Sequence, residues 1–415
     1  MSRRLWYRRA VEKLPIRSHS YHFNLAQHPF AANGFHSPAY LHYPGIIAML
    51  KRYQEWMYRW EDRLTSRDTN RVVRPFEWGV EWSRRWPGVD SAALTGPPEQ
   101  FFFSLNEKLV ANSDEFYSYD TPKDFRLERL PIRLCATGGP SSQDERKFAK
   151  QTGLFLRFTS PVETPYPENN TMNARWFPAR GRRAVLVLPQ WNADAIGHNA
   201  LCRIFNLSGI AALRMSMPYH DVRMPAELQR ADYAVSANIG RTIDAGRQAV
   251  CDIRACLDWL QSQGYSELGI MGTSLGSCYA FIASAHDARL KINAFNHAST
   301  YFGDVVWTGQ STRHIRQGIE GVLDQQGLRR AFLAISPMAY FNQFARWPKK
   351  SLMIYAKYDL TFLPEFSRVA AGEFARRQLN TIVRCLPCGH YTLGETPYKY
   401  LDAWHLCRFM AQAFR

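Results

Sequence analysis

LGIMGTSLGSCYAFIA, residues 268–283, is the stretch of this sequence that decides the fold. Its first four residues form an apolar run typical of a short buried strand, and residues 277–283 are small and apolar enough for a buried helix. Between them lies a G-x-S-x-G pentapeptide with Ser274 at its centre. A sharp turn from strand to helix holds such a serine in a strained backbone conformation and exposes its hydroxyl, and the glycines allow strand and helix to approach closely. We therefore interpret Ser274 as a nucleophile.

Two segments farther along the chain end in residues that can activate this serine. The segment 351–359 is expected to be an apolar strand that ends in Asp359, and the segment 381–390 is expected to be another strand that runs into a Gly-His turn containing His390. A serine hydroxyl needs a base within hydrogen-bond reach, histidine titrates near neutral pH, and a carboxylate fixes the histidine tautomer. We expect Ser274, Asp359 and His390 to form a catalytic triad. The alternatives are a helix N-terminal acid for Asp359 and an ordinary loop histidine for His390.

A triad of this kind also needs hydrogen-bond donors for the negative oxygen that develops in the transition state. In a strand–turn–helix site the first donor is the backbone N–H after the nucleophile, which here belongs to Leu275. The second comes from the loop that follows the central strand expected at 183–188, and that loop spans 189–192. The N–H of Trp191 is the first candidate for this donor, and that of Gln190 is the second.

These motifs resemble the α/β-hydrolase superfamily, in its serine esterase and lipase-like branch. The resemblance covers about residues 150–415, and within the branch the chain resembles the hydrolases grouped with abhydrolase domain-containing protein eighteen. It is carried by LPQWNAD (188–194), MPYHDVR (217–223), GTSLGS (272–277) and GHY (389–391). The resemblance implies hydrolysis of a carboxylic ester, including a lipid ester or a thioester, through an acyl-enzyme. An acyltransferase or a peptidase with the same triad, and a basic membrane-associated protein without catalytic activity, are the alternatives.

The chain is expected to divide near residue 150. Residues 1–150 mix helical stretches with proline-containing connections, and we interpret them as an N-terminal helical extension packed on the core. Residues 151–415 alternate strands and helices, which predicts an α/β fold with a mostly parallel sheet and helices on both faces. The segment at about 300–348 breaks this alternation and is expected to form a helical cap over the site. Candidate pocket residues in or near the cap are Trp307, Tyr301, Tyr219 and His297; for His297 a strand-end hydrogen bond is the favoured alternative.

Composition limits the classes of protein to which the chain can belong. Its 415 residues are 46% hydrophobic, carry a formal net charge of +16 and include eight cysteines without a disulfide-type spacing. No apolar run reaches the roughly 18–20 residues that span a bilayer, and the basic N-terminus lacks the apolar segment of a secretory signal. We expect a cytoplasmic protein, with peripheral contact to an anionic membrane as an alternative that the positive charge leaves open. The expected ligand is a small-molecule or lipid ester, with no nucleic acid, no cofactor and no metal.

Overall fold

The computed structural model describes residues 44–89, 96–132 and 151–415. The chain divides into two units between Tyr53 and Gln54, and the second unit, Gln54–Arg415, contains the whole sheet. Within it, β1 (Arg126–Pro131) precedes residue 150 and pairs with β2 (Thr152–Thr159) in one sheet. The expected boundary at residue 150 stays a prediction, but a cut at that position would separate two hydrogen-bonded strands.

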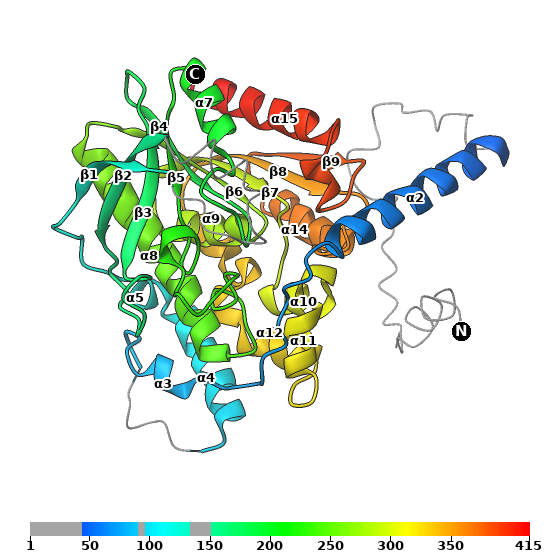
Figure 1. The fold of residues 1–415 in the computed structure, drawn as a ribbon, viewed down its shortest axis with the longest axis horizontal. Helices are drawn as coiled ribbons and strands as arrows, with labels where there is room; N and C mark the ends of the chain where they lie inside the picture. The colour runs from blue at the N-terminus through cyan, green and yellow to red at the C-terminus, as the bar shows by residue number, and fades with distance from the viewer. Residues whose placement is uncertain (1–43, 90–95, 133–150) are drawn as a thin grey trace. The chain divides into compact units, whose positions relative to one another are not determined.

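A single nine-stranded sheet occupies the centre of the second unit (Figure 1). The strand order is β1-β2-β3-β5-β4-β6-β7-β8-β9. Pairing is antiparallel from β1 to β5 and parallel from β5 through β4 to β9, which confirms the predicted mostly parallel sheet. The remaining strands are β3 (Thr171–Phe177), β4 (Arg183–Leu188), β5 (Ala211–Met215), β6 (Glu267–Thr273), β7 (Leu290–Asn296), β8 (Lys350–Ala356) and β9 (Thr381–Leu386).

Helices cover both faces of this sheet. Helices α7 and α15 pack together on one face, and α8, α9 and α14 pack on the other (Figure 1). Their bounds are α7 (Asn199–Leu207), α8 (Ile239–Ser262), α9 (Leu275–His286), α14 (Pro364–Arg376) and α15 (Tyr398–Ala413). Because the central strands face helices on both sides, β4 is completely buried from Ala184 to Leu188, which is why its sequence is an unbroken apolar run.

Helical segments also lie before the sheet and within it. The insertion between β7 and β8 is helical, which confirms that part of the prediction; it contains α10 (Phe302–Thr308), α11 (Arg313–Ile319), α12 (Gln325–Ala331) and α13 (Phe341–Phe344). The N-terminal helices are α2 (Pro44–Thr65), α3 (Val80–Ser83), α4 (Pro98–Ala111) and α5 (Ser113–Phe116). The second half of α2 is anchored by the buried side chains of Met57 and Leu64.

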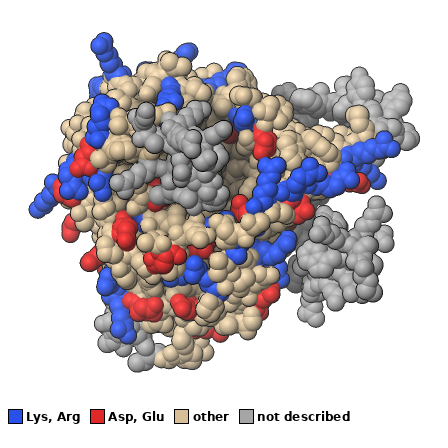
Figure 2. Space-filling view, viewed as in Figure 1, with Lys and Arg blue, Asp and Glu red and all other residues tan. Residues whose placement is uncertain are grey.

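The large positive charge is distributed and not gathered into one patch on the face shown in Figure 2, where basic and acidic side chains are interspersed. Some arginines are not on the surface at all: Arg214 pairs with Asp221 and Arg223 pairs with Asp252, all four side chains being buried. None of the described helices combines the length and the apolarity needed to cross a membrane. Peripheral membrane contact stays a prediction.

Candidate active site

Ser274 lies in the turn between β6 and α9, at the carboxyl edge of the sheet. Its φ angle of 56° places a non-glycine residue at positive φ, which is the strain expected of a nucleophile in such a turn, and its side chain is buried. Gly272 and Gly276 allow the strand, the turn and the helix to lie in close contact. A Cβ atom on Gly272 would lie 2.2 Å from the carbonyl oxygen of Gly276, and one on Gly276 would lie 2.5 Å from that of Pro189. The spacing of the pentapeptide is therefore set by backbone contact on both sides of the serine.

The structure brings the three predicted triad residues into one chain of hydrogen bonds. His390 Nε2 lies 2.9 Å from Ser274 Oγ, and His390 Nδ1 lies 2.9 Å from Asp359 Oδ2. The other carboxylate oxygen, Oδ1, accepts the backbone N–H groups of Thr361 at 2.8 Å and Phe362 at 2.7 Å. Asp359 therefore anchors the loop that leads into α14 and also orients the imidazole. This geometry suits proton transfer from the serine to His390.

Electrostatics favour a charged carboxylate beside a basic imidazole. Burial by itself would raise the pKa of Asp359, but the His390 charge and hydrogen bonds from two histidines hold it far below its ordinary value. Burial would lower the pKa of His390, and the negative charge and hydrogen bond of Asp359 outweigh this effect and raise it. The pair can therefore stabilise the imidazolium that forms when the serine loses its proton.

His297 is a second histidine on the same carboxylate. It follows β7, its Nδ1 lies 3.0 Å from Asp359 Oδ2, and its ring centroid is 4.2 Å from that of His390. Its φ is +55°, and burial followed by the nearby His390 lowers its pKa. The structure thus gives His297 the strand-end hydrogen bond that the sequence favoured, and also places it on the wall of the larger cavity described below.

The candidate oxyanion donors lie on two adjoining turns. Leu275 is the first residue of α9, so its N–H has no acceptor within the helix. In the described ranges the N–H groups of Trp191 and Gln190 also form no hydrogen bond. Trp191 lines the wall next to Leu275, whereas Gln190 lines only the larger cavity. The oxyanion assignment stays a prediction, with Trp191 in the better position.

His220, which the sequence did not predict as part of the site, holds the turn that carries Trp191 and Asn192. His220 Nε2 accepts the N–H of Asn192 at 3.0 Å, and His220 Nδ1 bonds to the carbonyl of Pro218 at 2.8 Å. Burial lowers the pKa of His220 to about 4, so that the ring is neutral and free to accept. Asn192 Oδ1 in turn accepts the N–H of Ala231 at 2.8 Å. These contacts fix the turn that carries Trp191.

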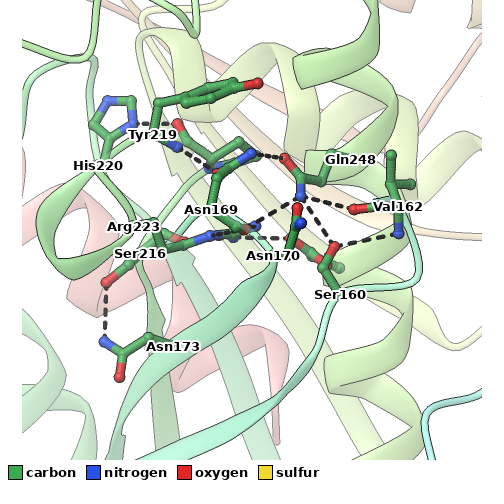
Figure 3. Close-up of polar contacts among 12 residues, drawn as sticks. Ser160, Val162, Asn169, Asn170, Asn173, Ser216, Tyr219, His220, Arg223 and Gln248 are labelled. Atoms are coloured by element: carbon green, nitrogen blue, oxygen red, sulfur yellow. Dashed lines mark hydrogen bonds and ion pairs between the residues drawn. The ribbon is translucent and has the colours of Figure 1, made fainter. Parts of the chain in front are cut away.

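A buried polar network holds the backbone next to His220 (Figure 3). Asn169 Oδ1 accepts the N–H of Tyr219 at 2.9 Å, and its Nδ2 donates to Gln248 at 2.7 Å. Arg223 donates to the carbonyl oxygen of Asn169 and forms a 2.8 Å ion pair with Asp252. Arg223 is thus a structural residue inside the protein, and it does not reach the substrate side.

Two cavities meet at Ser274. The smaller has a volume of about 40 Å³, and the larger a volume of about 1290 Å³. The smaller cavity lies between α9, α10 and the loop before α14, and its apolar walls include Leu275, Phe302, Val305 and Phe362. His390 lines only the larger cavity, which is walled by α7, α15 and loops rich in polar side chains.

The pocket candidates from the sequence separate into two groups. Tyr301 lines the smaller cavity and His297 the larger. Trp307 and Tyr219 line neither cavity among the described residues, and their assignment as pocket contacts stays a prediction. The Cζ atom of Arg316 lies 4.6 Å from the centroid of the Trp307 ring. Tyr219 is completely buried, with its ring packed edge-on against other tyrosines.

Comparison with known proteins supports the fold and does not go further. No protein-family model and no curated protein sequence matches the chain. Among solved structures, acetyl xylan esterase 1 from Thermoanaerobacterium sp. JW/SL YS485 is 13% identical, with a TM-score of 0.50 over 82% of this chain and 100% of that one. Acetyl xylan esterase from Paenibacillus sp. R4 is 14% identical, with a TM-score of 0.51 over 80% of this chain and 99% of that one. The chain therefore has the α/β-hydrolase fold, and the narrower resemblance to one group within it stays a prediction.

Proposed function

We propose that this protein is a serine hydrolase that cleaves a carboxylic ester through an acyl-enzyme on Ser274. The observation that carries the proposal is the hydrogen-bonded chain from Ser274 through His390 to Asp359, with both links at 2.9 Å. Positive φ at the serine and a carboxylate anchored by two backbone N–H groups also support acyl transfer. The two structural neighbours named above are acetyl xylan esterases, which agrees with this reaction class.

The proposed reaction has two halves, acylation of Ser274 and hydrolysis of the acyl-enzyme. Ser274 Oγ attacks the ester carbonyl carbon while His390 Nε2 takes its proton, and the carbonyl oxygen receives hydrogen bonds from backbone N–H groups. The tetrahedral intermediate then collapses, and His390 gives the proton to the departing alcohol oxygen. In the second half, water attacks the acyl-enzyme with His390 again as the base, which releases the carboxylic acid and restores Ser274.

The test is covalent labelling followed by mass spectrometry. A fluorophosphonate probe should modify Ser274 and no other serine in the native full-length protein. Ser274→Ala should abolish labelling and hydrolysis of p-nitrophenyl acetate, and Ser104→Ala, at an exposed position on α4, is a matched control for the serine-to-alanine change. A label on another serine with Ser274 unmodified would refute the assignment.

A further inference from the structure

The two unequal cavities at Ser274 restrict the substrate, provided that the proposed hydrolase activity is correct. We propose that the enzyme acts on esters of a short acyl group, acetyl to butyryl, carried by a large polar alcohol. The assignment of each cavity follows from the direction of proton transfer. Because His390 must reach the departing oxygen, the alcohol lies on the side of His390. His390 lines the larger cavity and not the smaller, so the acyl group enters the smaller one.

The volume of the smaller cavity sets the length of the acyl group. At about 40 Å³ it is roughly thirtyfold smaller than the cavity of about 1290 Å³ beside it, so it takes only a small group. The walls are firm: Phe302, Val305 and Phe362 are each at most 7% exposed and belong to packed apolar clusters. A longer acyl chain would have to push these side chains out of close packing, which costs free energy that a short chain does not.

The walls of the larger cavity are suited to a hydrogen-bonding alcohol. Asn296 Nδ2 donates to Asp402 Oδ2 at 2.9 Å. The remaining oxygens, Asn296 Oδ1 and Asp402 Oδ1, are buried and have no protein partner among the described residues. Lys399 and Arg230 lie on the same walls. Hydroxyl groups of a polar alcohol would satisfy the open oxygens, whereas a hydrocarbon chain would leave them unpaired.

The acyl half of the proposal is tested on the wild-type protein with p-nitrophenyl acetate, butyrate and octanoate. We expect kcat/KM for butyrate to stay within about 10-fold of that for acetate and to fall at least about 100-fold for octanoate. Val305→Ala enlarges the smaller cavity and should raise the ratio of hexanoate to acetate hydrolysis. Val369→Ala, an exposed valine on α14, is the matched control and should leave that ratio unchanged. Equal kcat/KM for octanoate and butyrate would overturn the acyl assignment.

The alcohol half is tested with an acetylated disaccharide compared with p-nitrophenyl acetate. Ala403→Trp places a bulky ring on the wall of the larger cavity. It should lower kcat/KM for the disaccharide ester about 10-fold more than for the small ester. Equal losses for both, or failure of the wild-type enzyme to cleave the disaccharide ester, would overturn this half. The proposed hydrolase itself fails only if Ser274 is not labelled, so the two failures are distinguishable.

A second inference, independent of the cavities, concerns α2. Glu61 is fully buried on this helix and accepts two backbone N–H groups from the turn that carries the catalytic histidine. Its Oε1 accepts the N–H of Tyr391 at 2.7 Å, and its Oε2 accepts that of Thr392 at 2.9 Å. A Cβ atom on Gly389 would lie 2.4 Å from Glu61 Oε2, so the carboxylate fills the concave side of the turn. We infer that Glu61 is a positioning residue for His390.

The charge of Glu61 also affects the pKa of His390, and a purely structural role would not do so. The groups that face His390 are Asp359 after β8, His297 after β7 and Glu61 on α2, with Tyr391 next to it in its own turn. Burial and then Asp359 raise the pKa of Glu61, and the two amide hydrogen bonds oppose this. Glu61 in turn contributes to the raised pKa of His390, after Asp359. Removing its charge should therefore make His390 easier to deprotonate.

The test compares Glu61→Gln with Glu55→Gln, an exposed position on the same helix that undergoes the same change of charge. We expect Glu61→Gln to lower kcat about 10–100-fold with little change in KM, because the amide cannot accept both N–H groups and the histidine shifts. The acidic limb of the kcat/KM–pH profile should move to lower pH. A profile that coincides with that of Glu55→Gln, or a loss of kcat explained entirely by a lower folded fraction, would overturn the inference.

Discussion

Gly276→Ala tests whether backbone contact behind the nucleophile sets the geometry of the site. An added Cβ would lie 2.5 Å from the carbonyl oxygen of Pro189, 2.7 Å from that of Leu188 and 2.9 Å from the Leu188 side chain. Ordinary contact begins at 3.4 Å, so that the end of β4 and the first turn of α9 must separate by up to about 0.9 Å. No flexible side chain can absorb this displacement, because two of the three neighbouring atoms are backbone oxygens.

The contact at Gly276 determines both the expected loss of stability and the expected loss of activity. Overpacking of this kind costs about 1–3 kcal/mol of the free energy of unfolding. The separation moves the N–H of Leu275 away from that of Trp191, and a displacement near 1 Å in a catalytic site can lower the rate about 10²-fold. We therefore expect kcat/KM for p-nitrophenyl acetate to fall about 100-fold, together with a lower melting temperature in a thermal scan.

Gly372→Ala supplies the control for the same chemical change. Gly372 lies inside α14 with no atom within 4 Å of the added Cβ. Alanine is a better helix former, so this variant should keep full activity and gain about 1 kcal/mol in unfolding free energy. If Gly276→Ala retains activity within threefold of the wild type at an unchanged melting temperature, the contact does not determine the site and the reasoning is wrong.

Three further results are expected. Asp359→Asn should fold normally and lose about 10⁴-fold in turnover, because it no longer fixes the His390 tautomer; near-normal turnover would place the acid elsewhere. Because His390 must be neutral to act as a base and its pKa is raised, kcat/KM should increase with pH through a midpoint above 6.5, and a midpoint below that value would contradict the assignment. Arg223→Met should lower the unfolding free energy in urea by about 3–5 kcal/mol, since it removes the counter-charge of the buried Asp252; a change below 1 kcal/mol would show that the pair is dispensable.

The fold and the reacting groups were predictable because their signals are local. The turn at Ser274 is bounded by a strand and a helix whose apolar patterns differ. Gly272 and Gly276 stand where a Cβ atom would clash with neighbouring backbone. Asp359 and His390 each follow a strand of the same parallel sheet, so their carboxyl ends had to meet at one edge. No knowledge of side-chain packing was needed for these conclusions.

The supporting groups were not predictable, because they depend on packing between distant segments. Glu61 reaches Tyr391 across 330 positions, and a glutamate within a mostly exposed helix carries no mark of burial in the sequence. In the sequence His220 is marked only as part of the MPYHDVR stretch (217–223), and its bond to Asn192 depends on how that stretch folds back. The sequence places Trp307 in the cap segment but does not determine which way its side chain points, and it is absent from the walls of both cavities.

The reacting groups and their supports differ for a physical reason. A buried carboxylate such as Asp359 is tolerated only if its charge is matched, and here two histidines and two backbone amides match it. Each partner must itself be held in place, so the requirement extends outward to Glu61 behind the histidine turn. The chemistry restricts the residue types at the centre, whereas any donor or acceptor with the right reach can serve at the periphery. A motif can therefore identify the centre of such a site, and only the folded chain shows what fixes it.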